Sequence, residues 1–132
     1  MRFVFFLLCL VGISHNLSAQ NIQKMSEAEQ LGMTAGLAAA CGAQKLSDFE
    51  LIASRLIANA APTEKAEKQQ IRAYMQMRYN TIQRQKKDAP IPCSEILEHF
   101  NQIPLFNAIV YRDGSVKLPD GVWSKPIRPL NP

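Results

Sequence analysis

The chain has 132 residues and a formal net charge of +4 at pH 7, from 15 lysines and arginines against 11 aspartates and glutamates. Its length fits a single domain, and so small a positive surplus does not indicate a nucleic-acid partner. No apolar stretch of membrane-spanning length follows Ile13, so we expect no transmembrane helix beyond that residue.

Residues 1–19 have the three parts of a cleavable secretory signal peptide. Arg2 supplies the positive charge, residues 3–13 are almost entirely apolar, and Ala19 is the small residue expected before the cleavage site. An apolar run of that length is too short for a bilayer core of about 30 Å. We therefore predict a mature chain that begins at Gln20 and is periplasmic or extracellular.

The cysteines support the same interpretation. Cys9 lies in the apolar run and follows Leu8 rather than a small residue, which argues against a lipoprotein; an uncleaved N-terminal anchor is a further alternative. Cleavage leaves Cys41 and Cys93, which we expect to form a disulfide in an oxidising compartment. Two free thiols or a metal site are the alternatives. His99 is the one histidine of the mature chain, so the ligand set is incomplete and we predict no metal and no cofactor.

Capping residues and apolar periodicity predict four helices. Ser26 and Glu29 have the spacing of a capping box, Ser47 and Glu50 repeat it, and Thr63 is a third candidate cap. The predicted helices span, in chain order, Glu27–Cys41, Asp48–Ala60, Glu64–Lys87 and Cys93–Gln102. We expect a mainly α fold, a small bundle of about four helices. The first helix has a face rich in small residues, which allows another helix to approach closely.

The third predicted helix is the longest and the most basic. Its apolar periodicity predicts a buried stripe of Ile71, Tyr74, Met75, Arg78, Tyr79 and Ile82. Its surplus of positive charge suggests a face for an anionic envelope component or an acidic protein, with Arg72, Arg78 and Arg84 as candidate partner-binding residues. The alternative is a solvated face, because acids at the start and lysines at the end of a helix suit its dipole.

The C-terminal part changes character after Pro104. Residues 106–111 and 115–118 are β-prone and flank Asp113-Gly114, a turn signal that predicts a hairpin. An extended, proline-spaced tail should follow from Pro119. We therefore divide the chain into a signal peptide, a helical bundle and a hairpin with an extended tail, at residues 1–19, 20–104 and 105–132.

The tail carries Trp123, the only tryptophan of the chain, and the spacing Pro126-x-x-Pro129 with Arg128 between the prolines. Proline spacing of this kind favours polyproline II, which is used in recognition, and tryptophan is enriched at the energetic centres of interfaces. Trp123 and Arg128 are therefore candidate partner-binding residues. The alternative is that Trp123 covers the bundle and the prolines stiffen the chain end.

No catalytic site is predicted. His99 follows Glu95 by four residues, which places a carboxylate near an imidazole on a helix, but no activated nucleophile accompanies them, since Ser94 is a natural helix-capping residue. A small hydrolase is accordingly the third hypothesis for function, and we predict a protein that is not an enzyme.

Three sequence features resemble one group of proteins: residues 38–42, with their alanines before Cys41-Gly42; Arg78-Tyr79-Asn80 in the longest helix; and Cys93-Ser94 opening the last helix. In these the chain resembles small exported, single-disulfide helical proteins of Gram-negative bacteria. The resemblance covers roughly residues 28–103. Most members of that group have no assigned activity, so the resemblance implies export, a disulfide and a helical fold, and no specific function.

Protein binding is the function that we expect first: an accessory or assembly factor of an envelope or secretion system, or an inhibitor or immunity protein. The alternative is a periplasmic chaperone or a carrier of lipid or another hydrophobic ligand. Flexible thioethers and aromatic rings suit an adaptable apolar groove. The residues expected to line such a groove are Tyr74, Met75, Met77 and Tyr79.

Overall fold

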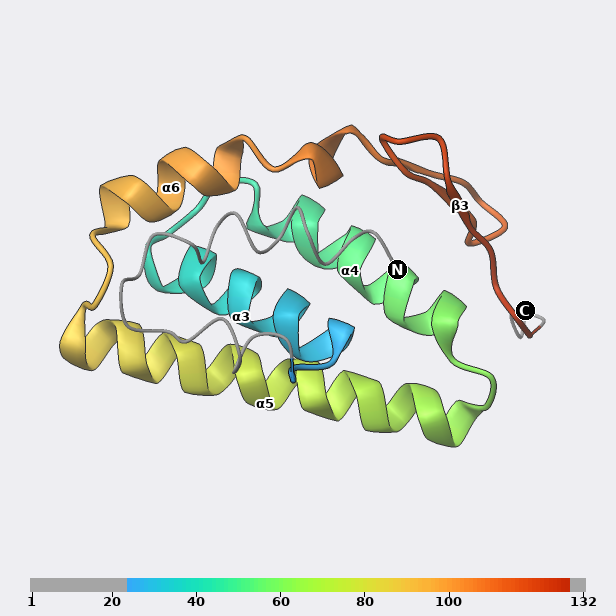
Figure 1. The fold of residues 1–132 in the computed structure, drawn as a ribbon, viewed down its shortest axis with the longest axis horizontal. Coiled ribbons are helices and arrows are strands. Elements are labelled where there is room, and N and C mark those ends of the chain that lie inside the picture. Colours follow the sequence, from blue (N-terminus) through green and yellow to red (C-terminus); the bar gives the residue numbers. More distant parts are fainter. Residues whose placement is uncertain (1–23, 129–132) are drawn as a thin grey trace.

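A computed structural model describes residues 24–128 of the chain (Figure 1). Its helices are α3 (Glu27–Ala40), α4 (Leu46–Ala60), α5 (Glu64–Asp88) and α6 (Cys93–Asn101). A 3-10 turn, Pro104–Asn107, then leads into the strands β1 (Ile109–Val110), β2 (Val116–Lys117) and β3 (Trp123–Ser124). The predicted mainly α fold with four helices and a small C-terminal β structure is confirmed. The predicted signal peptide lies outside the described residues.

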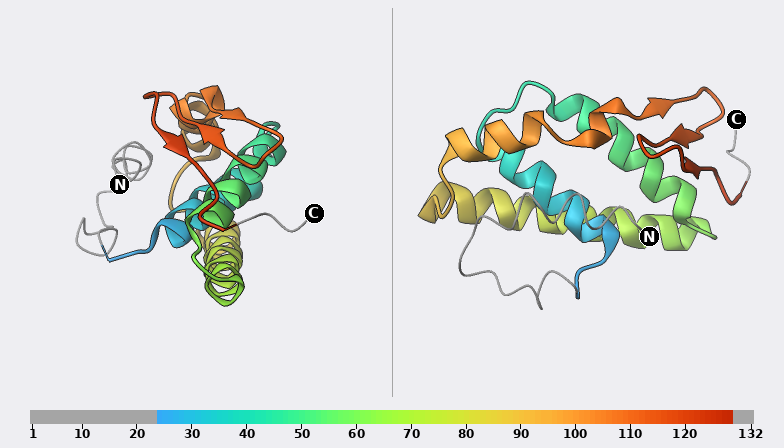
Figure 2. Two further views of the ribbon diagram at one scale, coloured as in Figure 1. Left: turned by 90° about the vertical axis from the view of Figure 1, so that its right-hand side faces the viewer. Right: turned by 45° about the horizontal axis from the view of Figure 1, so that its top comes forward.

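The elements are stacked around α3 and α4. In Figures 1 and 2, α5 runs along one side of these two helices, and α6 and the sheet lie on the opposite side. Within residues 24–128, no helix combines the length and the apolar character needed to cross a bilayer.

The contact between α3 and α5 is made nearly backbone to backbone. A Cβ atom added to Gly32 would lie 2.3 Å from the carbonyl oxygen of Tyr74, and one added to Gly36 would lie 2.7 Å from that of Arg78. Ala28 and Ala35 of α3 are also buried. The small residues that the sequence places on α3 therefore let α5 approach closely, as predicted.

Three phenylalanines join α4 to the C-terminal part of the chain. The Phe49 ring centroid lies 5.4 Å from that of Phe100 and 6.4 Å from that of Phe106. The rings of Phe100 and Phe106 meet edge to face at 5.2 Å. Val116 and Leu118 extend the same core beneath the sheet, so the bundle and the sheet share one core.

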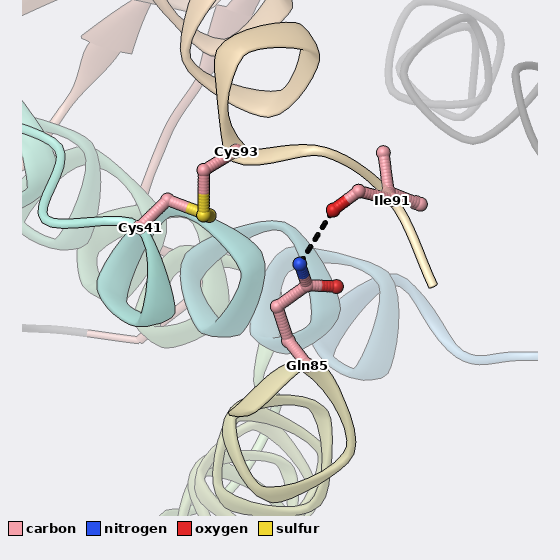
Figure 3. The surroundings of a disulfide bond; sticks show 4 residues. All are labelled: Cys41, Gln85, Ile91 and Cys93. Atoms are coloured by element: carbon pink, nitrogen blue, oxygen red, sulfur yellow. Dashed lines mark hydrogen bonds between the residues drawn. A yellow bond between two sulfur atoms is a disulfide. The ribbon is translucent and has the colours of Figure 1, made fainter. Parts of the chain in front are cut away.

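The predicted disulfide between Cys41 and Cys93 is present, with a Cα–Cα distance of 5.4 Å across 52 residues of sequence. It joins the end of α3 to the beginning of α6. In Figure 3, Gln85 reaches from α5 beside this bond, and its amide nitrogen donates a hydrogen bond to the Ile91 carbonyl at 2.6 Å. Both contacts hold the segment between α5 and α6 in place.

The start of α4 differs from the prediction. The helix begins at Leu46, with Lys45 at the N-cap and no capping side chain, so the box predicted for Ser47 and Glu50 does not form. Glu50 instead faces α5, where it accepts hydrogen bonds from Tyr74 and Arg78. An ion pair with an arginine together with a second hydrogen bond is a stronger attraction for a carboxylate than a single bond from a backbone amide.

The buried side of α5 is also different from the predicted stripe. Tyr74 is buried, but Ile71, Met75 and Tyr79 are exposed. The reason is that α5 packs mainly on the small residues of α3. A helix whose main contact is with one closely approached neighbour buries only a narrow line of its surface, so the apolar residues beside that line stay in contact with solvent.

The C-terminal segment contains a third strand where an extended tail is predicted. β2 pairs antiparallel with both β1 and β3. A second turn permits this: Gly121 has φ +86°, and the Asp120 carboxylate accepts a hydrogen bond from the Val122 amide at 3.0 Å. Trp123 thereby belongs to the sheet.

Candidate functional site

The outer face of the sheet gathers exposed aromatic, aliphatic and basic side chains. The strand register places Ile109, Lys117 and Trp123 side by side across the three strands. Tyr111 and Lys125 follow two residues after Ile109 and Trp123, and therefore share this face. We call these five residues the sheet face: Ile109, Tyr111, Lys117, Trp123 and Lys125.

Two aromatic rings form the centre of the sheet face. The centroids of Tyr111 and Trp123 lie 5.1 Å apart at an interplanar angle of 34°, within the range that stabilises aromatic pairs. The Tyr111 amide donates a hydrogen bond to the Ser115 carbonyl at 2.9 Å, which places these two residues opposite each other. Ser115 is buried. Trp123 is 44% exposed and Tyr111 40%, so the pair presents a large apolar area to solvent.

Two ammonium groups lie beside the Trp123 ring. Lys117 Nζ is 5.8 Å and Lys125 Nζ is 5.6 Å from its centroid, distances at which a cation is attracted to the indole face. This attraction restrains two otherwise flexible side chains next to the aromatic pair. The sheet face therefore offers two positive charges next to an apolar centre.

The acidic residues near the sheet accept hydrogen bonds from backbone amides of its turns. Asp113 accepts a hydrogen bond from the Ser115 amide at 2.9 Å, and this bond lowers the pKa of its carboxyl. Asp120 is engaged in the same way by Val122. Both carboxylates keep their negative charge but belong to the turns at the ends of the strands, whereas the charged side chains of the sheet face itself are the two lysines.

The inner face of the sheet is attached to the bundle through Asn59 at the end of α4. Its side-chain nitrogen donates to the Gly114 carbonyl at 2.9 Å. It also donates to the carbonyl and the hydroxyl of Ser124, both at 3.2 Å. The backbone carbonyl of Asn59 accepts a hydrogen bond from the backbone amide of Ile127. With only 2% of its surface exposed, Asn59 joins the β1–β2 turn, β3 and the segment after β3 to one helix.

The five predicted partner-binding residues do not form one site. Trp123 belongs to the sheet face, and Arg72 and Arg84 are exposed on α5, on the far side of the bundle (Figure 2). Arg78 pairs with Glu50 at 2.8 Å, and Arg128 forms an ion pair with Glu67 of α5. These last two arginines hold elements of the fold together. Pro129 lies outside the described residues.

The residues of the other two hypotheses are also dispersed. Glu95 and His99 border a cavity of about 10 Å³, which is the space of one water molecule and leaves no room for an organic substrate. Tyr74 is buried while Met75 and Tyr79 are exposed, so the predicted apolar groove does not form from them. Among residues 24–128, no cluster of three or more metal-ligating side chains occurs.

A larger cavity lies between the beginnings of α3 and α5 and the end of α4. It measures about 200 Å³, and its lining is mostly apolar. The residues around it are Glu27, Ala28, Leu31, Leu56, Ile57, Ala60, Ala61, Pro62, Ala66 and Gln70.

Sequence reasoning missed Tyr111, Lys117, Lys125 and Asn59. A signal for the first three was present, because odd-numbered residues share one face if residues 109–111, 117 and 123–125 are all in strands. That signal is readable only if a third strand is assumed where the sequence predicts an extended tail. Asn59 carried no such signal, since its role depends on partners 55 and 65 residues away.

No protein-family model matches the chain, and no curated protein and no solved structure is significantly similar to it. The geometry and chemistry of its surfaces are therefore the guide to its function.

Proposed function

We propose that this protein is an exported, non-catalytic accessory factor that binds a protein partner through the sheet face. The class includes assembly factors of an envelope or secretion system as well as inhibitors and immunity proteins. The observation that carries the proposal is the exposed Tyr111–Trp123 pair, flanked by Lys117 and Lys125, on a sheet whose other side is attached to the bundle.

The composition of the sheet face supports binding to a protein. Tryptophan and tyrosine contribute most to the energy of many interfaces, since they bury a large area and lose little conformational entropy. The Asn59 hydrogen bonds and the ion pair of Arg128 hold the sheet in place before any partner arrives. Preorganisation of this kind reduces the entropic cost of association.

Two features support export. The disulfide between Cys41 and Cys93 belongs to a class of bond that persists in oxidising compartments and is rare in the cytosol. The apolar segment at residues 3–13 has the length and flanks of a signal peptide.

Site-specific crosslinking tests the proposal. A photoreactive amino acid at Trp123 should yield one discrete adduct in the compartment that contains the mature protein. The matched control carries the same group at Leu51 of α4, where the exposed fraction is 52% against 44% for Trp123, and should not yield that adduct. Reversing charge with Lys117→Glu and Lys125→Glu should weaken the adduct at Trp123.

The same experiment can refute the proposal. Equal adducts from positions 123 and 51, or an adduct at 123 that tolerates both charge reversals, would mean that the sheet face does not select a partner. Circular dichroism and protease resistance of each variant establish that it is folded.

The cavity of about 200 Å³ between α3, α4 and α5 supports a second candidate function, transport of a small hydrophobic ligand. It is smaller than typical ligand pockets of about 300–1,000 Å³, which restricts a ligand to a short acyl or ring compound. An environment-sensitive dye should bind the native protein, and Ala60→Phe at an exposed position of the lining should abolish binding. Binding unaffected by this change would refute the candidate.

A further inference from the structure

The exposed side of α5 carries apolar residues in a row. Ile71, Met75 and Tyr79 follow one another at intervals of four residues, so they lie along the same side of the helix. All three are exposed, Met75 at 53% and Tyr79 at 59%. In Figures 1 and 2 the helix forms the outer edge of the molecule, away from the sheet and α6. The row is thus a convex ridge of apolar side chains.

Positive charge accompanies this ridge. Arg72 precedes Met75 by three residues, and Lys86 follows Tyr79 by seven, so both extend from the same side of α5. The acidic residues in the first turns of the helix are paired: Glu64 with Lys68 at 2.7 Å, and Glu67 with Arg128. Pairing of the acids leaves a positive potential along the ridge.

We propose that this α5 ridge, Ile71, Arg72, Met75, Tyr79 and Lys86, is a peripheral binding surface for anionic lipid headgroups. The charge of the ridge calls for an anionic counterpart. It also argues against a second copy of the chain, because packing α5 on α5 would bring the same cations together. A convex ridge suits a headgroup layer, which adapts to the shape that it receives.

The residue types fit a membrane interface. Tyrosine combines an apolar ring with a polar hydroxyl and is enriched where hydrocarbon meets water. Arginine and lysine extend charged ends to the headgroups while their aliphatic parts cover the boundary. Surface helices of this kind bind through buried apolar area together with attraction to anionic lipid. The sheet face lies on the other side of the bundle (Figure 2), so the two surfaces can act independently.

Vesicle cosedimentation with the intact, disulfide-bonded mature protein tests the proposal. The protein should bind vesicles of phosphatidylcholine mixed with phosphatidylglycerol, and should bind phosphatidylcholine alone only weakly. High salt should reduce the binding, because ions screen exposed charges. Arg72→Glu should reduce the affinity by roughly tenfold or more, since each basic residue near an anionic surface contributes about 1 kcal/mol. Met75→Gln should reduce it as well.

Two matched controls separate the ridge from general charge and hydrophobicity. Leu51→Gln removes an equally exposed apolar side chain from α4, and Arg112→Glu reverses a charge in the exposed β1–β2 turn; neither should change vesicle binding. Trp123→Ala should also leave it unchanged, which makes this test independent of the proposed partner site. The proposal is overturned if mixed vesicles are not bound, or if controls and ridge variants lose affinity equally.

Discussion

Two regions of this molecule are held together in opposite ways. The contact between α3 and α5 depends on two glycines, Gly32 and Gly36, which have no side chain and so allow the two helix backbones to touch. The C-terminal part, residues 93–128, lies over α4 and depends on a few specific attachments. The α3–α5 seam should therefore be destabilised by mutations that add atoms. The attachments of the C-terminal part should be destabilised by mutations that remove atoms.

The attachments of the C-terminal part are spaced along its length. Cys93 joins its beginning to α3, Phe100 and Phe106 pack on Phe49 in the middle, and Asn59 binds the sheet near its end. This spacing explains how strands of two residues each persist, since an isolated hairpin is only marginally stable in water.

Removing the disulfide should have the largest effect on stability. Cys41→Ser with Cys93→Ser should lower the free energy of unfolding by roughly 4 kcal/mol, the entropy that the chain-entropy model assigns to a closed loop of this length. Urea unfolding of the variant, and of the native protein with and without reductant, measures the change. If reduction left the urea midpoint unaltered, the C-terminal part would be held by its other attachments alone.

Adding one methyl group to the α3–α5 seam should rank next. Gly32→Ala should cost about 3 kcal/mol, because the new carbon would meet a backbone oxygen that cannot move aside. The gain in helix propensity, about 1 kcal/mol, offsets only part of such a clash. Thermal and urea unfolding measure the loss.

Gly36→Ala provides the internal comparison for the seam. The added carbon would lie 2.7 Å from the Arg78 carbonyl oxygen, against 2.3 Å from that of Tyr74 at Gly32, so the overlap is less severe and the loss should be smaller than at Gly32. An increase in stability for both variants would contradict backbone contact at this seam.

Removing the Asn59 amide should weaken the sheet specifically. Asn59→Ala should cost roughly 2 kcal/mol, because the buried carbonyl of Gly114 and the polar groups of Ser124 lose their donor. Hydrogen exchange should quicken at the amides of β2 and β3, while the amides of α3 keep their protection. Asn101→Ala, at an exposed position of α6, is the control. Uniformly faster exchange would show that the sheet and bundle unfold together.

The smallest effect should be a change in alkaline stability. Burial, assisted by the Glu50 carboxylate, raises the pKa of Tyr74 above its usual 10.0, so only the unfolded chain ionises just above that pH. The contribution of Tyr74 to stability should therefore be constant below pH 10.0 and fall as the pH rises beyond it. Tyr74→Phe should remove this part of the fall, at a cost of about 1 kcal/mol at neutral pH for the lost hydrogen bond.

Urea midpoints measured on both sides of pH 10.0 test the prediction for Tyr74. Tyr79→Phe, at an exposed position of the same helix, is the control and should retain the full alkaline fall. The same alkaline slope in the native protein and in Tyr74→Phe would rule Tyr74 out as its source.

The sequence predicts most of the helical architecture because its signals are local. Ser26 and Thr63 cap their helices as expected, with each side chain accepting a hydrogen bond three residues on. The disulfide was predicted because removal of the predicted signal peptide would leave two cysteines. Of the candidate site, Trp123 was identified because its residue type is informative at any position, whereas its neighbours Tyr111, Lys117 and Lys125 were not.

The sequence by itself determined where the helices form, that two cysteines were available to pair, and that α3 has a face of small residues. Only the tertiary structure decided which side of α5 is buried, that Glu50 binds Tyr74 and Arg78 instead of capping α4, and that a third strand completes the sheet. The physical reason is one of range. Capping and helical periodicity act over three or four residues, whereas Glu50 meets partners 24 and 28 residues away. The third strand pairs with β2 nearby in sequence but is also bound by Asn59, 65 residues away.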